Sequence, residues 1–163
     1  GVDHKEILSS KYLLKHVREE GGAYGVNAMH PSGLNLFSSY DDPNVLRTVE
    51  QFRGGCDWIR NGEFSAKDVE EARMSLFGDI DAPREPQSYG FDALFTQKTE
   101  ADKQAQRVCL LDATKSELVE VAQRAYDVHA DAMQTFVFGN KKSVKEVESK
   151  ANWIIEDLTH LSV

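Results

Sequence analysis

The sequence predicts an α+β protein, in which a small antiparallel or mixed sheet is covered by helices. Apolar residues recur at helical spacing over most of the chain, whereas residues 23–40 change to a period of two. A later segment, residues 133–138, is short, apolar and β-prone, and we expect it to form a buried third strand. Because 163 residues are enough for a substantial core, we expect residues 1–163 to belong to a single domain.

The first helix is predicted to end at a pair of glycines. Asp3 and Glu6 have the spacing of a capping box, which satisfies free amides at a helix N-terminus. The helix should end near Glu20, because Gly21 and Gly22 accept the left-handed conformation common just past a helix C-terminus. The apolar residues on or near one face of this helix are Ile7, Leu8, Leu14 and Val17.

A β-hairpin is predicted after the glycine pair. Residues 23–30 alternate with a period of two, and residues 31–33, Pro-Ser-Gly, have the composition of a turn. Residues 34–40 are then expected to return as the second strand. The side chains predicted to share one face of the first strand are Tyr24, Val26, Ala28 and His30.

A second helix should begin where Asp42 caps it and Pro43 takes its first position, and it should end near Asn61. Gly54 and Gly55 lie inside this helix and lack the spacing of a phosphate-binding loop, so we expect them to allow close packing against another helix. The apolar stripe of this helix comprises Val45, Val49, Phe52, Cys56 and Ile59.

The remaining chain is predicted to be mainly helical. A loop is expected at residues 79–88, which contain two prolines. Three pairs have capping-box spacing and should begin helices: Ser65 with Asp68, Thr114 with Glu117, and Ser143 with Glu146. Two further helices are expected at residues 89–98 and 99–111.

Composition excludes several classes of partner. The formal net charge of −8 argues against nucleic acid, which usually requires a basic face, and is compatible with cationic ligands. No apolar run is long enough to span a bilayer, so we expect no membrane partner. Cys56 and Cys109 have no CxxC spacing and lie on apolar helical stripes, so we expect both to be buried free thiols.

The chain carries no recognisable hydrolytic centre. The nearest of its five histidines, His4 and His16, are twelve residues apart, whereas a zinc peptidase helix needs two histidines four apart with a glutamate beside them. A G-x-S-x-G nucleophile motif is also absent. We therefore expect no metal site and no catalytic residue in this chain.

The run Arg-Glu-Glu-Gly-Gly-Ala-Tyr-Gly at residues 18–25 is the strongest binding signal. In one interpretation Arg18 is only a charge at a helix end, where the helix dipole favours a cation. In the other, Arg18 and Tyr24 project into a cleft and donate hydrogen bonds to a peptide carbonyl or to the oxyanion that develops on it.

The residues between Arg18 and Tyr24 fit the second interpretation. Small residues at Gly21, Gly22 and Gly25 would let a peptide backbone approach closely. Glu19 and Glu20 could attract cationic peptide side chains.

The chain resembles the last domain of the pitrilysin/insulinase superfamily, in its presequence protease and falcilysin branch. The distinctive part is LLKHVREEGGAYGVNAMHPSGLNLFSSYDDPNVLRTVEQF, in which a helix ends in Arg-Glu-x-Gly-Gly-Ala-Tyr-Gly before a hairpin and an Asp-Pro-Asn helix start. Further resemblance lies in DAPREP, LLDATKSELVEVAQRAY and MQTFVFGN, so most of the chain is covered.

This resemblance implies a function for the run at residues 18–25. Members of the family are large clamshell zinc peptidases of four related α/β domains, and the first domain holds an inverted HxxEH zinc motif. The last domain contributes an arginine and a tyrosine that reach the substrate, and these would be Arg18 and Tyr24, with Gly21 and Gly22 beside them. The zinc ligands have no match in this chain, so the resemblance implies that zinc is bound by a domain that the chain omits.

The resemblance also implies how the chain fits into a parent protein. The chain would be the C-terminal part of a peptidase that degrades short unfolded peptides in a closed chamber, incomplete on its N-terminal side and inactive alone. Its partners would be peptide substrates and the missing upstream domains. This branch works mostly in mitochondria and plastids, although we find no targeting pattern at the N-terminus of the chain.

Two alternatives remain open at the level of sequence. A noncatalytic peptidase homologue, such as a substrate-recognition subunit, would bind peptides or partner chains without its own metal. A helical interaction module would use Arg18 only as a helix-end charge.

Overall fold

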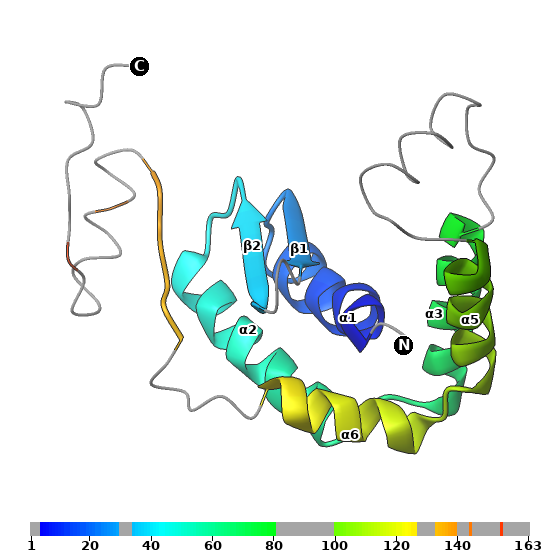
Figure 1. The fold of residues 1–163 in the computed structure, drawn as a ribbon. Coiled ribbons are helices and arrows are strands. Elements are labelled where there is room, and N and C mark those ends of the chain that lie inside the picture. Colours follow the sequence, from blue (N-terminus) through cyan, green and yellow to red (C-terminus); the bar gives the residue numbers. More distant parts are fainter. Residues whose placement is uncertain are drawn as a thin grey trace, which may run out of the picture.

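The computed structural model describes residues 4–29, 34–80, 100–126, 133–139, 144 and 154. These residues form an α+β fold with a two-stranded sheet (Figure 1). The elements are α1 (His4–Ile7), the π-helix η1 (Leu8–Glu19), β1 (Gly25–Met29), β2 (Leu36–Tyr40), α2 (Val45–Arg60), α3 (Ala66–Ile80), α5 (Glu100–Asp112) and α6 (Lys115–Tyr126).

The helices surround the N-terminal segment. In Figure 1, α2, α6 and the paired helices α3 and α5 follow an arc around α1, and the hairpin lies beside η1. Contacts of α2 with η1, of β1 with η1 and of α6 with α2 close this arrangement. The hydrophobic core therefore lies between η1, the hairpin and α2, and continues along α6 toward α3.

The first helix is continuous, as predicted, but most of it is wound as a π-helix. In this form backbone hydrogen bonds join residues five apart, as between the Glu20 amide and the Lys15 carbonyl at 2.9 Å. The wider winding moves Leu14 away from the predicted core face, so it is only half-buried. That prediction assumed α-helical spacing and is wrong for this reason. The fully buried side chains of the segment are Ile7, Leu8, Leu13 and Val17.

The predicted hairpin is confirmed, with strands slightly shorter than expected. β1 and β2 pair antiparallel, with Val26 opposite Ser39 and Ala28 opposite Phe37. Val26, Ala28 and Phe37 pack against the core, and the Phe37 ring stacks on Phe52 of α2 at 5.4 Å. The inward face of the hairpin thus fixes its position on α2 and η1.

Gly54 and Gly55 allow α2 to approach η1 closely, as predicted. A Cβ atom on Gly55 would lie 3.0 Å from Leu8 Cδ1, and one on Gly54 would lie 2.7 Å from the Tyr12 hydroxyl. Tyr12 also donates a hydrogen bond to the Gln51 side chain at 3.1 Å. The glycine pair therefore serves helix packing.

Two of the predicted helix caps form capping boxes. The Asp68 carboxylate accepts from the Ser65 amide at 2.7 Å, and the Glu117 carboxylate accepts from the Thr114 amide at 2.8 Å. Both hydroxyls accept in return, from the amides of Asp68 and Glu117. These contacts explain why α3 and α6 begin where the sequence indicates.

The predicted start of α2 is wrong. α2 begins at Val45 with Asn44 at its N-cap position, and the Asn44 side chain makes no capping hydrogen bond. Asp42 instead accepts from the Asn44 amide at 2.8 Å, which forms a local turn before the helix. Pro43 lies in this turn rather than in the first position of the helix.

The predicted third strand is also wrong. Residues 133–139 contain no regular secondary structure, and the sheet has two strands within the described ranges. Phe136 and Phe138 are 73% and 81% exposed, so the segment is not buried. β-propensity reflects packing against neighbouring strands, and no partner strand is paired with this segment in the described part of the chain.

Other predicted elements cannot be compared with the structure. Asp3, the turn at residues 31–33, the helix at residues 89–98 and the capping residues of the last helix, Ser143 and Glu146, lie outside the described residues. The expected loop at residues 79–88 is described only for residues 79 and 80, which end α3.

The two cysteines are free, as predicted, but they differ in exposure. Cys56 is half-buried, and burial raises the pKa of its thiol to about 11. Cys109 is exposed on α5, so its predicted burial is wrong. The apolar stripe of α5 turns Leu110 inward rather than Cys109.

Substitution of Gly55 by leucine should overpack the contact between α2 and η1. We expect a loss of about 1–3 kcal/mol in the free energy of unfolding, measured by urea denaturation. Gly78→Ala is the matched control, because a Cβ atom there meets nothing within 4 Å and alanine favours a helix. An unchanged stability in Gly55→Leu would contradict the packing of α2 on η1.

The two thiols should differ in alkylation rate. Because thiolate is the reactive form, the raised pKa leaves Cys56 almost wholly protonated at pH 8, and iodoacetamide should modify Cys109 much faster. Mass spectrometry of the peptides against time measures both rates. Denaturation in urea should make the two rates similar, and equal rates in the folded chain would contradict the burial of Cys56.

Candidate functional site

Arg18 and Tyr24 line the same surface pocket. The pocket has a volume of about 690 Å³ and lies where η1 ends and the chain enters β1. Arg18 is exposed at the end of η1, and Tyr24 is 67% exposed just before β1. The residues that line the pocket are Leu14, Arg18, Glu19, Gly22, Ala23, Tyr24 and Asp41.

The turn between Arg18 and Tyr24 closes the carbonyl end of η1. The Gly22 amide donates to the Arg18 carbonyl at 2.9 Å, and the Ala23 amide donates to the Val17 carbonyl at 3.2 Å. These two nested bonds resemble a Schellman motif that has been widened by one residue, as the π-winding of η1 requires. The turn therefore satisfies helix carbonyls that would otherwise lack partners.

Both glycines of the turn are required by its geometry. Gly22 has φ of +82°, a left-handed conformation that favours glycine. A side chain on Gly21 would collide with the Val17 carbonyl oxygen. The predicted roles of Gly21 and Gly22 in ending the helix are thus confirmed, and Gly22 also lines the pocket.

Tyr24 is fixed on its other side by the end of β2. Its amide donates to the carbonyls of Tyr40 and Asp41, at 3.2 and 3.3 Å. The Tyr40 ring covers Gly25, where any side chain would collide with it, and lies 5.6 Å from the Tyr24 ring. Gly25 therefore makes room for Tyr40 rather than lining the pocket.

Residues at the start of α2 also contact this turn. The Asn44 side-chain amide donates to the Gly21 carbonyl at 2.7 Å. The Arg47 guanidinium donates to the Glu20 carbonyl at 2.9 Å and also contacts the Glu20 carboxylate at 3.3 Å. Side chains of the N-cap residue and of the first turn of α2 thus reach two consecutive carbonyls of the turn.

The two glutamates of the run have different surroundings. Glu20 does not line the pocket, because its carboxylate contacts His16 at 2.9 Å as well as Arg47. The hydrogen bond with His16 is the main reason that the pKa of Glu20 is lowered. Glu19 lines the pocket together with Asp41, a residue that the sequence did not indicate. Of the two glutamates expected to attract cationic groups, Glu19 lines the pocket and Glu20 does not, and the second carboxylate there belongs to Asp41.

The pocket combines several kinds of chemistry. Arg18 and Tyr24 bring hydrogen-bond donors to its edge, Leu14 brings an apolar side chain, and Glu19 and Asp41 bring carboxylates. Such a set suits a ligand with carbonyl acceptors and a cationic group. Sequence reasoning missed Leu14 because α-helical spacing assigned it to the core. It missed Asp41 because this residue comes beside Tyr24 only when β1 and β2 pair.

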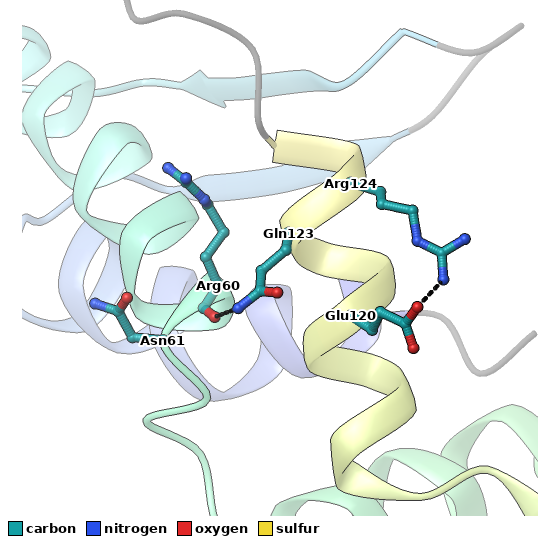
Figure 2. Close-up of a pocket in the computed structure, with 5 residues that line it drawn as sticks. All are labelled: Arg60, Asn61, Glu120, Gln123 and Arg124. Carbon is teal, nitrogen blue, oxygen red and sulfur yellow. Dashed lines mark hydrogen bonds and ion pairs between the residues drawn. The ribbon is translucent and has the colours of Figure 1, made fainter.

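A second pocket, between α2 and α6, contains mainly polar side chains that contact one another. Figure 2 shows Arg124 paired with Glu120, at 2.6 Å, and the Gln123 side chain donating to the Arg60 carbonyl, at 3.4 Å. Its fifth lining residue is Asn61, and its volume is about 430 Å³. Since these contacts are ordinary surface pairs, we assign this pocket no function.

The described residues contain no group of three or more histidine, cysteine, aspartate or glutamate side chains close enough to hold a metal ion. In the same part of the chain, each helix is too short or too polar to cross a membrane.

Comparison with known proteins identifies the family. The model of the PreP C-terminal domain matches residues 5–139. The mitochondrial presequence protease of Danio rerio is 34% identical over 151 residues, which cover 92% of this chain and 15% of the relative. That of Saccharomyces cerevisiae is 33% identical over 155 residues, which cover 93% of this chain and 15% of the relative.

A third relative is the mitochondrial presequence protease of Gibberella zeae, which is 38% identical over 121 residues. These cover 73% of this chain and 12% of the relative. The chain thus spans no more than about 15% of the length of these relatives. Because the family model covers most of the chain, including the pocket at the end of η1, the chain belongs to the PreP C-terminal domain family.

Proposed function

We propose that this chain is the substrate-binding C-terminal part of a zinc metalloendopeptidase that degrades short unfolded peptides. Cleaved targeting presequences would be one such substrate, held in a closed chamber. The family match and the relatives named presequence protease support this proposal. We also propose that the chain has the fold of a pitrilysin-like peptidase domain and is incomplete on its N-terminal side.

The observation that carries the proposal is the shared pocket of Arg18 and Tyr24. The guanidinium is a fork of donors with a permanent charge, and the phenol is a neutral donor on a rigid ring. Two such donors at one carbonyl oxygen would bind the substrate, and they would bind more strongly as negative charge develops on that oxygen. Arg18 and Tyr24 thus act on the scissile carbonyl or on a neighbouring one.

The rest of the pocket supports peptide binding. Gly22 and Ala23 present little side-chain bulk, so an extended backbone can approach the turn. Glu19 and Asp41 favour a cationic group on the peptide. Gly21 contributes by forming the turn, since its carbonyl is already bound by Asn44.

The described residues do not fit a zinc site, because no three suitable side chains lie together. We propose that zinc is held by an upstream domain of the parent protein, outside this chain, and that this domain closes over the pocket. The chain itself then contributes substrate binding and charge stabilisation, and the hydrolytic centre belongs to its partner domain. The relatives named mitochondrial support a location in the mitochondrial matrix, and the plastid is the alternative for this branch.

Loss of either donor should reduce peptide turnover by the full-length protein. We expect Arg18→Ala and Tyr24→Phe each to lower kcat/KM for a fluorogenic peptide by about 10²- to 10³-fold, the effect of removing one oxyanion donor. Lys15→Ala is the matched control, because Lys15 is an exposed cation of η1 that does not line the pocket. Wild-type turnover in both pocket variants, with normal folding, would favour a helical interaction module instead.

Zinc dependence should separate the full-length protein from the isolated chain. A chelator should abolish peptide cleavage by the full-length protein, and added zinc should restore it. The isolated chain should cleave nothing at any zinc concentration. Chelator-sensitive cleavage by the purified chain would contradict the proposal. A full-length protein that binds peptides but cleaves none, with or without zinc, would favour a noncatalytic homologue.

A further inference from the structure

The relative position of Arg18 and Tyr24 depends on the turn that joins them. Arg18 lies two residues before Glu20, and Tyr24 lies two residues after Gly22. Because glycine has more conformational freedom than other residues, two successive glycines leave this connection poorly determined by itself. The nested hydrogen bonds to η1 close the turn, and contacts from elsewhere in the chain further restrict its conformation.

Those contacts come from the first turn of α2 and the residue before it. Asn44 binds the Gly21 carbonyl at 2.7 Å, and Arg47 binds the Glu20 carbonyl at 2.9 Å. Both acceptors follow the last turn of η1, where backbone carbonyls lack partners within the helix. The donors belong to another element, so they tie the end of η1 to α2.

Asn44 is itself held in place by β2. Its amide donates to one Asp42 oxygen at 2.8 Å, and the Ser39 hydroxyl donates to the other oxygen at 2.8 Å. Asn44 is the N-cap residue of α2, yet its side chain makes no capping hydrogen bond. Its side-chain amide is therefore available for the Gly21 carbonyl, and removing it does not uncap the helix.

We propose that Asn44 and Arg47 are positioning residues that hold the turn of residues 20–22 so that Arg18 and Tyr24 face one pocket. This inference rests on the proposed function of Arg18 and Tyr24. Neither Asn44 nor Arg47 lines the pocket, so both act through the turn and do not touch the substrate. Arg47 adds an ion pair with the Glu20 carboxylate, at 3.3 Å.

The test uses the full-length protein with Asn44→Ala. We expect kcat/KM for a fluorogenic peptide to fall by about 3- to 10-fold, the equivalent of one hydrogen bond, mainly through kcat. Amide hydrogen exchange at residues 22–24 should become faster by a similar factor, while exchange in α3 stays unchanged. Asn61→Ala is the matched control, because Asn61 lies at the other end of α2 and its side-chain amide donates to the Glu63 carboxylate rather than to the turn.

A double-mutant cycle separates positioning from general destabilisation. In the background of Arg18→Ala with Tyr24→Phe, Asn44→Ala should cause no further loss in kcat/KM, because the groups it positions are gone. An equal loss in both backgrounds would overturn the inference. Arg47→Ala should mimic Asn44→Ala, and Arg47→Lys should recover part of the activity because it retains the charge and one donor.

The outcomes distinguish this inference from the function on which it rests. Unchanged hydrogen exchange at residues 22–24 in Asn44→Ala would overturn the inference even if Arg18 and Tyr24 prove essential. Full activity of Arg18→Ala and Tyr24→Phe would overturn the proposed function, and with it the catalytic purpose of holding the turn through Asn44 and Arg47. In that case the exchange measurement still decides whether Asn44 holds the turn.

Discussion

The closed carbonyl end of η1 is the constraint on which the pocket depends. The last carbonyls of η1 accept hydrogen bonds from backbone amides of the turn that follows the helix. Gly21 and Gly22 permit the sharp reversal of the backbone that these bonds require. The nested hydrogen bonds to Val17 and Arg18 then direct the chain into β1. This closure places Arg18, at the end of η1, and Tyr24, just before β1, beside one pocket.

Packing in the core connects α2 to η1 and so to this turn. Close packing at Gly54 and Gly55 brings α2 against η1, and this packing sets the distance from which Asn44 and Arg47 reach the turn. Stacking of Phe37 on Phe52 fixes the hairpin against the same helix. Packing in the interior and geometry at the pocket are therefore linked through α2, since one helix contacts both the core of η1 and its end.

Much of this arrangement could be predicted from local sequence patterns. The capping boxes at Ser65 and Thr114 and the period of two in the hairpin are local signals, and each corresponds to an element. The joint exposure of Arg18 and Tyr24 was expected from their spacing around the glycines. These features depend on residues a few positions apart.

The parts that could not be predicted depend on contacts between distant residues. The π-winding of η1 has no sequence signature that we recognise, and it exchanged Leu14 for Leu13 in the core. Residues 133–139 have strand propensity but no paired strand in the described ranges. The contacts of Asn44 and Arg47 with the turn span more than twenty residues, so the Asp-Pro-Asn segment was interpreted only as a helix start.

Arg18 and Tyr24 are proposed to bind one peptide together. A structure of the full-length protein with a bound, uncleaved peptide tests this most directly. We expect the Arg18 guanidinium and the Tyr24 hydroxyl both to lie within hydrogen-bond distance, about 2.7–3.2 Å, of peptide carbonyl oxygens. The peptide should lie along the small residues of the turn. A bound peptide that leaves both side chains without contact would contradict the account.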